Sequence, residues 1–411
     1  MAILPSTLKE KLALAVTGND GMVYNYTVSF NGDFPYEAGK VYNSELTFGG
    51  MEDGYGTAAI FDNNVTGEAW DESDNKGSAK DNPYLIESAG HLKYLIEQVK
   101  AGEPYADKFF KLTTDIKVTA DTWTPIGISS AKPFSGNFDG GGHTISGELK
   151  GRFSNDIQNF GFFGYLTTKS SMLIENIHIA ANITWSFASP EGTSYSYLGV
   201  GGVIGNGYAQ TITVHNCTMS GEMQISDGSL GYGYLSIGGV CGHTTGAFNN
   251  CSAIGKINVE CKGGSISIGG IVGMNRSIAN ETKHCINASS ITFSNTEHSN
   301  TNYAISVGGI GGDIGGKILG CCNQGSITGH SLSSVDVGGI AGFAELAKCH
   351  LNRNLTTDFS VTSGETVRLG YLIGHLQNST AYSCNESVGE QSQWIGSNPA
   401  WTPTIDDESA H

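Results

Sequence analysis

The chain has 411 residues, which is long enough for one large domain or two smaller ones. Glycine is abundant, with 58 residues against only 9 prolines. This excludes collagen, because a collagen triple helix needs far more proline and a glycine at every third position. The formal net charge is −17 and lysine and arginine are nowhere clustered, so the sequence lacks the positive surface that binds nucleic acid or anionic lipid.

Residues 1–69 have the pattern of a small antiparallel β-domain. Two segments, MVYNYTVSF from Met22 and KVYNSELTF from Lys40, alternate apolar and polar residues as half-buried strands do. Three or four strands are too few for a complete sandwich, so we expect a partial one, whose open edge could accept a strand from a partner chain. Residues 70–83 are rich in Gly, Asp, Ser and Lys and are predicted to be a linker.

A single helix is predicted over residues 84–101. Apolar side chains recur there at the spacing of one helix face: Leu92, Leu95, Ile96 and Val99. Ser88 suits the N-cap and Gly102 the position after the last turn. A solenoid needs a cap because its open end exposes core and unpaired strand edges, so we assign this helix that role.

A repeat occupies the second half of the chain. Its copies are LGVGGVIG from Leu198, LSIGGVCG from Leu235, ISIGGIVG from Ile266, ISVGGIGG from Ile305, VDVGGIAG from Val335 and VRLGYLIG from Val367. With a degenerate copy at Phe160, they are spaced 30–41 residues apart. Alternating apolar residues share one face of a short strand and can stack coil upon coil.

No amphipathic helix separates the copies, which points to strands that pair with their equivalents one coil away. The predicted fold class is therefore all-β. It is a right-handed parallel β-helix (solenoid) with one N-terminal capping helix, preceded by a partial antiparallel β-sandwich. We expect the β-helix to cover residues 84–395 and to be followed by a C-terminal tail at residues 396–411.

All nine cysteines lie between residues 217 and 384. Six of them follow the repeat copies at similar distances: Cys217, Cys251, Cys285, Cys322, Cys349 and Cys384. We interpret them as a ladder of small buried side chains, mainly free thiols, because stacked parallel positions rarely give the dihedral angle of a disulfide. A zinc site that combines Cys321 and Cys322 with Cys349 and His350 is the weaker alternative, since the spacing suits successive coils better. No metal and no cofactor is expected.

No catalytic residues are expected either. The sequence has no HExxH and no GxSxG motif, and no helix follows the glycine-rich segments as a phosphate loop requires. Polysaccharide lyases and hydrolases do occur on β-helices, but they need paired carboxylates or acidic calcium ligands. The acidic residues of the repeats occur singly: Glu222, Asp227, Glu260, Asp313, Asp336 and Glu345.

Long inserts precede three successive repeats and should project near one another. They are ITWSFASPEGTSYSY, SDGSLGYGY and SNTEHSNTNY. Amphipathic aromatic residues on adaptable loops are common in recognition surfaces. The candidate ligand-binding residues are Trp185, Phe187, Tyr195, Tyr197, Tyr232 and Tyr234. The alternative for Trp185 and Phe187 is that they only cover the outside of the solenoid.

The repeat, best represented by SIGGVCGHTTGAFNNCSAIGKI at residues 236–257, resembles the GLUG motif. The upstream run LIESAGHLKYLIEQVKAGEPYADKFFKLTTDIKV resembles the segment that precedes GLUG repeats in surface proteins of Bacteroides-type gut bacteria. AGKVYNSELTFGG and AAIFDNNVTGEAW are similar to the closing strands of fimbrillin-like domains. GLUG repeats also occur beside a peptidase domain in immunoglobulin-A-cleaving enzymes, but no part of that catalytic motif is present.

The resemblance implies a secreted adhesin or fimbria-associated subunit at the bacterial outer-membrane surface, without catalytic residues. Its expected ligand is a glycan or a host or bacterial surface protein. No segment approaches the ~18 apolar residues of a membrane span, so no direct membrane insertion is expected. Two alternatives remain: a carbohydrate-active enzyme, which a cleft with two carboxylates would favour, and an inert spacer, which a smooth rod would favour.

Overall fold

The computed structural model describes residues 11–17, 23–29 and 58–396, the last range with gaps at residues 72, 188–196, 210, 228–233, 299–304, 346–348, 351, 357, 378–381, 384–385 and 388–394. The chain forms two compact units, residues 1–57 and 58–411. In the first unit, β1 (Lys11–Thr17) and β2 (Val23–Ser29) pair antiparallel. Strand β2 coincides with the first predicted strand, whereas the second, at residues 40–48, lies outside the described residues.

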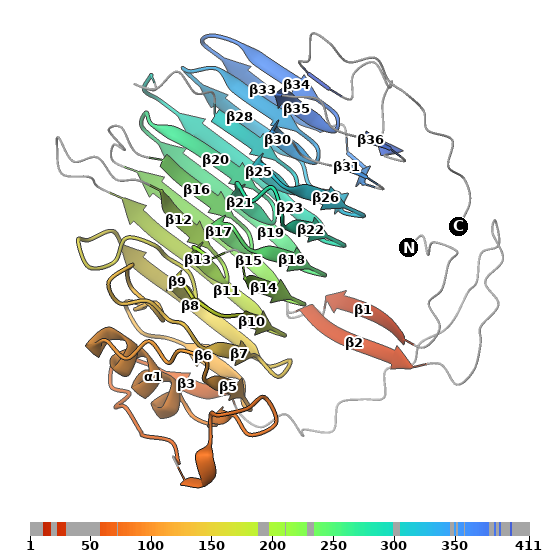
Figure 1. Ribbon diagram of the computed structural model, residues 1–411. Coiled ribbons are helices and arrows are strands. Elements are labelled where there is room, and N and C mark those ends of the chain that lie inside the picture. The colour runs from red at the N-terminus through yellow and green to blue at the C-terminus, as the bar shows by residue number, and fades with distance from the viewer. Residues whose placement is uncertain are drawn as a thin grey trace. The chain divides into compact units, whose positions relative to one another are not determined.

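The second unit is a parallel β-helix, as predicted (Figure 1). Its first sheet has six strands: β12 (Leu198–Gly201), β16 (Tyr234–Gly238), β20 (Ser265–Gly269), β24 (Ile305–Gly308), β29 (Val335–Gly338) and β34 (Val367–Gly370). Its second sheet has seven strands: β9 (Phe163–Leu166), β13 (Ile204–Gly207), β17 (Cys241–Thr244), β21 (Val272–Asn275), β25 (Gly311–Ile314), β30 (Ala341–Glu345) and β35 (Ile373–Gln377).

Two larger sheets complete each coil. The ten-stranded sheet comprises β4 (Tyr84–Ile86), β5 (Phe109–Leu112), β7 (Asn137–Asp139), β10 (Met172–Glu175), β14 (Ile212–His215), β18 (Ala247–Asn249), β22 (Glu281–Lys283), β26 (Lys317–Leu319), β31 (Cys349–His350) and β36 (Tyr382–Ser383). The twelve-stranded sheet comprises β3 (Ala59–Phe61), β6 (Ile116–Val118), β8 (Thr144–Arg152), β11 (His178–Phe187), β15 (Thr218–Asp227), β19 (Ser252–Cys261), β23 (Ile286–Asn295), β27 (Cys322–Asn323), β28 (Ile327–Ser331), β32 (Arg353–Asn354), β33 (Phe359–Ser363) and β37 (Glu386–Ser387).

The apolar positions of the repeat form the core. Val200, Ile237 and Ile268 stand opposite one another on successive strands of the six-stranded sheet and are at most 1% exposed. The glycine pairs of the repeat are needed for a reason other than a sharp turn between two strands. A Cβ atom on Gly239 would lie 2.2 Å from the carbonyl oxygen of Gly270 in the next coil. The glycines are therefore required because neighbouring coils meet there backbone to backbone.

The predicted cap is present as helix α1 (Ala89–Ala101), which contacts β3 and β4 at the first coil (Figure 1). Ser88 Oγ accepts a hydrogen bond from His91 N at 3.0 Å, as an N-cap side chain does. Gly102 has φ 112° and its N–H donates to the carbonyls of Gln98 and Val99. The four predicted apolar side chains are buried. Residues 84–86, predicted as the start of the helix, instead form β4, because Tyr84 and Ile86 are buried against β5.

The predicted boundaries at residues 1–69 and 70–83 are wrong, because the solenoid begins at residue 58. Strand β3 pairs in parallel with β6 in the twelve-stranded sheet. Trp70 is 5% exposed, and its ring centroid lies 4.8 Å from that of Tyr94 and 5.4 Å from that of Phe110. Residues 70–83 have the composition of a linker, but Trp70 at their start is buried in the core. One tryptophan side chain buries enough apolar area to hold its segment against the core.

The cysteine ladder is confirmed with one correction. Its third and fourth rungs are Cys285 and Cys321, joined by a hydrogen bond of 3.4 Å from Cys285 N to Cys321 Sγ. Cys322 is half-buried and starts β27, so alternation along that strand turns it away from the core, which is why the predicted rung was wrong. No disulfide joins any two of the eight cysteines that the structure describes, whereas Cys384 lies outside the described residues. Burial raises the pKa of the Cys349 thiol to about 12, which keeps it unreactive.

Candidate functional site

The structure separates the six predicted ligand-binding residues. Trp185 and Phe187 are 1% and 3% exposed. The Trp185 ring stacks on Phe160 at 4.5 Å, and the Phe187 ring packs against Phe153 at 4.5 Å. Strand β11 continues through both residues, and period-two alternation buries them with the other inward side chains of that strand. The prediction that they contact a ligand is therefore wrong.

Tyr195 and Tyr232 lie outside the described residues, but Tyr197 and Tyr234 are brought together from successive coils. Their rings are stacked, with centroids 5.1 Å apart and planes at 22°. On its other side, Tyr197 stacks on His243 at 5.0 Å and 10°. Tyr197 is 41% exposed and has φ 59°, a backbone conformation that bulky residues rarely adopt. The sequence thus predicted this tyrosine pair but not its histidine.

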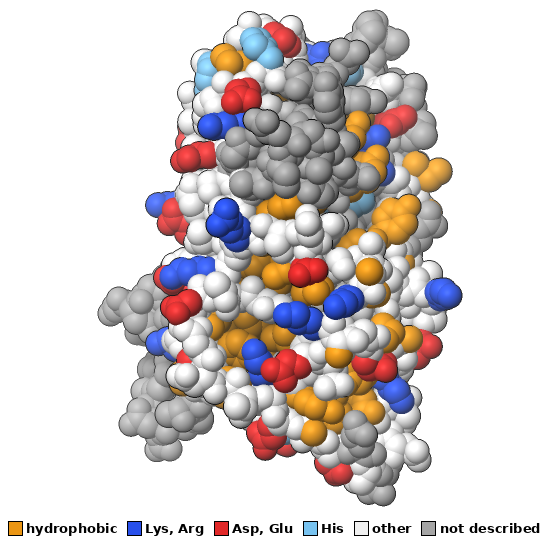
Figure 2. Space-filling view, turned by 90° about the vertical axis from the view of Figure 1, so that its left-hand side faces the viewer, with side chains coloured by type: hydrophobic (Ala, Val, Ile, Leu, Met, Phe, Trp, Pro, Cys, Tyr) orange, Lys and Arg blue, Asp and Glu red, His pale blue; other side chains and the backbone are white. Residues whose placement is uncertain are grey.

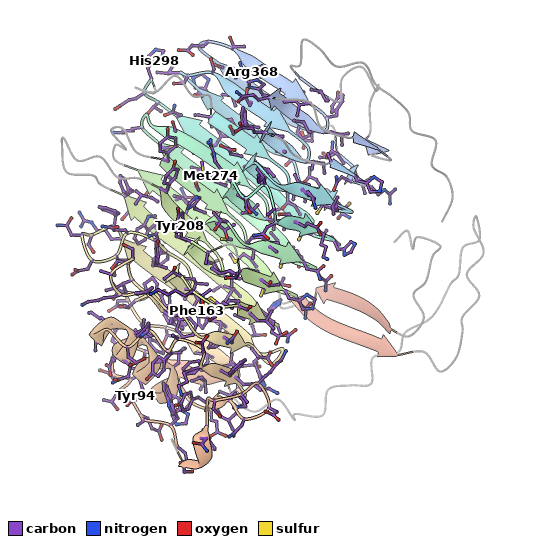
Figure 3. The ribbon with its side chains drawn as sticks, viewed as in Figure 1. Tyr94, Phe163, Tyr208, Met274, His298 and Arg368 are labelled. Carbon is purple, nitrogen blue, oxygen red and sulfur yellow. The ribbon has the colours of Figure 1, made fainter. Side chains whose placement is uncertain are left out.

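Tyr234 also lines a groove between the six-stranded and seven-stranded sheets, which meet at the glycine corner. We call it the corner groove, and the register of the strands defines its two rows. One row is Gly199, Ser236, Ser267, Ser306, Asp336 and Arg368, and the other is Asn206, His243, Met274, Asp313, Phe343 and His375. Met274 and Arg368, which line the groove, follow one another along the solenoid in Figure 3.

Small residues make the corner concave. A Cβ atom on Gly242 would lie 2.3 Å from Val200 N, and one on Gly199 would lie 1.9 Å from Gly205 O. The two backbones therefore touch at the base of the corner, and larger side chains further out form its walls. Between Tyr234 and Gln377 the walls enclose a cavity of about 340 Å³.

One part of this cavity, the charged end, holds ion pairs in its floor. Its residues are Arg276, Asp313, Asp336, Glu345, Arg368 and His375. Arg276 Nη2 donates to Asp313 Oδ2 at 2.6 Å, and burial raises the pKa of the Asp313 carboxyl although Arg276 opposes this. Asp336 is 1% exposed and has both oxygens engaged, Oδ1 by Arg368 Nε and Oδ2 by His375 Nδ1 at 3.3 Å.

The expectation that acidic residues occur only singly is wrong for this cavity. Asp313 on β25 belongs to one coil, and Asp336 on β29 and Glu345 on β30 belong to the next. The turn between β29 and β30 places Asp336 and Glu345 on the two sides of one coil, and stacking of the coils adds Asp313 to the same cavity. An alignment of the copies by their glycine pairs could have found Asp336, which stands where the three preceding coils have Ser236, Ser267 and Ser306.

At the other end of the cavity, the tyrosine end, Tyr234 lines the cavity; beside it Tyr197 stacks on both Tyr234 and His243, and Tyr208 lies against His243. Burial lowers the pKa of His243 to about 4, with a smaller contribution from Arg276, so its imidazole is neutral at physiological pH. The corner groove thus runs from stacked, uncharged aromatic rings to a floor of paired charges. Elsewhere, the face in Figure 2 shows acidic and basic side chains interspersed, without an extended patch of one sign among the described residues.

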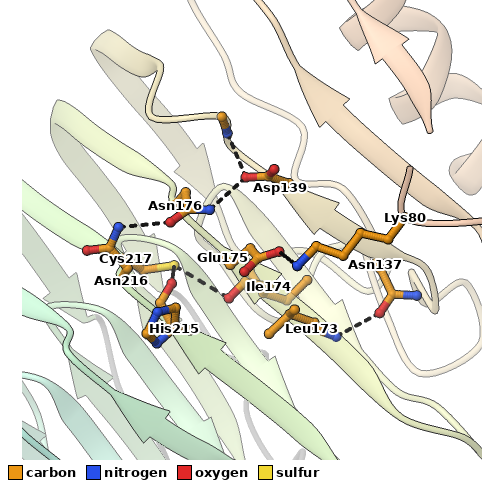
Figure 4. Close-up of polar contacts among 11 residues, drawn as sticks. Lys80, Asn137, Asp139, Leu173, Ile174, Glu175, Asn176, His215, Asn216 and Cys217 are labelled. Atoms are coloured by element: carbon orange, nitrogen blue, oxygen red, sulfur yellow. Dashed lines mark hydrogen bonds and ion pairs between the residues drawn. The ribbon is translucent and has the colours of Figure 1, made fainter. Parts of the chain in front are cut away.

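A second polar cluster, at the corner between the ten- and twelve-stranded sheets, is structural (Figure 4). Asn176 and Asn216 have φ 55° and 51° at equivalent turns, and Asn216 Nδ2 donates to Asn176 Oδ1 at 2.8 Å. Asp139 accepts from Asn176 Nδ2 and from Gly141 N, which ties its carboxylate to the turn. Lys80 Nζ pairs with Glu175 Oε1 at 2.6 Å beside it. These side chains hold their own corner together.

Within the described parts of the chain, no three His, Cys, Asp or Glu side chains are arranged to hold a metal ion. Cys321 and Cys349 of the alternative zinc site are instead buried in the cysteine ladder. No helix among the described residues has the length and apolar character needed to cross a membrane.

No family model matches the chain. One relative is a "Putative Gly-rich membrane protein" of Evansella cellulosilytica, which is 33% identical to this chain over 135 residues. The matched segment covers 31% of this chain but only 14% of the length of the relative. The fold of the chain resembles the crystal structure of a "putative immunoglobulin A1 protease" from Bacteroides ovatus, with a TM-score of 0.53 and 19% identity over 76% of this chain and 86% of that chain. At this identity the likeness concerns the fold alone. The chain is therefore a repeat-built protein of the parallel β-helix class.

Proposed function

We propose that this chain is a non-catalytic adhesin, or a fimbria-associated subunit, that binds a glycan in the corner groove. One observation carries the proposal. A single cavity, lined by residues of several coils, combines Tyr234, on which Tyr197 stacks, with paired acidic and basic side chains. Such a groove argues against an inert spacer, for which a smooth rod is the expected shape.

A sugar ring fits both halves of the groove. Its C–H faces pack on aromatic rings, and its hydroxyls need donors and acceptors at fixed positions. Tyr197 and Tyr234 supply the rings, whereas Arg276 and Asp313 supply a donor beside an acceptor. Because equivalent positions recur with each coil at the ~4.8 Å strand spacing, the groove suits a linear chain rather than a compact small molecule.

Cell-surface location belongs to the same proposal. The Evansella relative is named as a membrane protein, and the chain with the similar fold comes from Bacteroides ovatus. The resemblance of residues 236–257 to the GLUG motif and of residues 38–50 to fimbrillin-like strands points the same way. A protein ligand, or a fimbrial subunit added through the edge of the first unit, is a further possible partner.

The arrangement of the carboxylates favours binding over catalysis. A glycosidase needs one carboxyl group that is free to protonate the leaving oxygen and a second that acts as base or nucleophile. Both carboxylate oxygens of Asp336 are hydrogen-bonded, one to Arg368 and the other to His375. One oxygen of Asp313 is hydrogen-bonded to Arg276. The presence of two buried carboxylates in one cavity is nevertheless the observation that favours a carbohydrate-active enzyme as second candidate.

The test is a binding screen of the purified chain on immobilised glycans, with each hit analysed for product by mass spectrometry. The variant Tyr197→Ala with Tyr234→Ala should weaken binding about tenfold or more, because it removes the aromatic platform. Ile60→Ala is the control, since Ile60 is 50% exposed on the first coil, far along the chain from the groove. Unchanged binding by the tyrosine variant would refute the groove as the site, and turnover of a glycan would replace the adhesin by the enzyme.

A further inference from the structure

The charged end contains one more carboxylate than guanidinium group. Arg276 is already paired with Asp313 and Arg368 with Asp336. Glu345, on the same wall, forms no ion pair with any described residue. A carboxylate or sulfate on a ligand would therefore meet the unpaired charge of Glu345, whereas each arginine of the cavity already has a carboxylate partner, and this disfavours anionic ligands.

The same residues are well suited to hydroxyl groups. The Arg276 guanidinium has several N–H donors and uses Nη2 for Asp313 at 2.6 Å. A donor and an acceptor thus stand side by side at the surface of the cavity. Two neighbouring hydroxyls of a sugar can accept from the one and donate to the other at the same time.

At the tyrosine end, three buried polar atoms have no hydrogen-bond partner among the described residues. They are Asn206 Oδ1, Ser236 Oγ and His243 Nδ1, on side chains at most 4% exposed. Asn206 stands opposite His243 in the seven-stranded sheet, and Ser236 lies on the facing strand of the same coil as His243. These atoms are fully buried and their residues do not line the cavity, so they are not ligand contacts; Tyr234, which does line it, is the uncharged aromatic group at this end.

We infer that the corner groove selects neutral, polyhydroxylated glycans and discriminates against glycans that carry carboxylate or sulfate groups. This inference rests on the proposed glycan-binding function and adds the ligand class. Both ends of the cavity contribute to it. The charged end has an excess of carboxylates, and at the other end the lining residues Tyr234, Ser265 and Ser267 carry no charge.

The experiment compares the affinity of the intact chain for neutral oligosaccharides, such as gluco-, manno- and galacto-oligosaccharides, with that for polygalacturonate, chondroitin sulfate and heparin fragments. Titration calorimetry at about 0.01 M ionic strength leaves electrostatic effects least screened. We expect at least one neutral series to bind about tenfold or more tightly than every anionic one. Glu345→Gln should narrow this ratio severalfold by raising the affinity for the anionic glycans.

Glu260→Gln is the matched control, because it makes the same change of charge on the exposed surface of β19. An equal gain in anionic binding by both variants would show that the net charge of the chain, not the groove, causes the discrimination, and would overturn the inference. Tighter binding of an anionic series would overturn it as well, while leaving glycan binding intact. Failure of both classes to bind would instead refute the proposed function on which it rests.

Discussion

The ion pair between Arg368 and Asp336 gives the sharpest test of how the charged end is built. Asp336 has a side chain that is only 2% exposed, whereas that of Arg368 is 28% exposed. Arg368→Met leaves the carboxylate buried with His375 as its remaining partner. Breaking a fully buried pair costs about 3–5 kcal/mol. Because His375 remains and Arg368 is partly solvated, we expect a loss of about 2–3 kcal/mol in the free energy of unfolding.

The second variant of this test follows from the repeat. Asp336→Ser installs the residue that the three preceding coils carry at this position. Combined with Arg368→Met, it removes the buried charge together with its partner. The double variant should therefore regain most of the stability lost by the single variant, as expected for a coupled pair.

Hydrogen exchange is the appropriate assay, because the stability of a solenoid is roughly a sum of contributions from neighbouring coils and its unfolding need not be all-or-none. Protection of the amides of β29 and β34 should fall in Arg368→Met and return in the double variant. Unchanged protection in the single variant, or a double variant as labile as the single one, would refute this account of the ion pair.

Further predictions concern the core and the thiols. Gly239→Ala should lower the free energy of unfolding, measured by urea denaturation, by about 1–3 kcal/mol or more, because the new Cβ would lie 2.2 Å from a carbonyl oxygen. Gly207→Ala should lower it much less, because the nearest contact there is a hydroxyl oxygen at 3.3 Å. Equal losses would contradict the close approach of the coils. The pKa of His243 is lowered to about 4 in the fold, so below pH ~6.5 the unfolded chain binds more protons. The free energy of unfolding should therefore fall by up to about 3 kcal/mol as the pH is lowered from 6.5 to 4, and His243→Asn should make its dependence on pH flatter. An unchanged pH dependence in the variant would show that the His243 imidazole is not buried in its neutral form. Finally, iodoacetamide at pH 8 should alkylate half-buried Cys322 before Cys321, as mass spectrometry of the native protein can establish; the reverse order would contradict the corrected ladder.

Local patterns were sufficient for the features that depend on neighbours in the sequence. The spacing of apolar residues from Leu92 to Val99, with Ser88 before them, predicts helix α1 because capping and helix periodicity act within a few residues. The repeated glycine pairs predict the parallel β-helix, because identical copies can bury their apolar face only by stacking. Tyr197 and Tyr234 were named from the sequence only as candidate ligand-binding residues, and their stacking is seen in the structure alone.

Other features were misjudged because their environment comes from distant segments. Trp70 sits in a polar stretch, yet tertiary contacts with Tyr94 and Phe110 bury it. Trp185 resembles a loop aromatic in sequence, but β11 continues through it and turns it to the core. Which of Cys321 and Cys322 faces inward depends on where β27 begins, and composition does not reveal that position.

The sequence by itself therefore determined the architecture, a capped, glycine-rich β-helix. Each repeat copy has its inward-facing apolar residues at the same positions relative to its glycines. The tertiary structure alone decided the candidate site. Asp313, Asp336 and Glu345 occur singly along the chain, and only the stacking of coils places them in one cavity with Arg276. The physical reason is that a repeat specifies its own strands through local alternation, whereas a groove is formed by side chains from several coils whose alignment depends on the register between them.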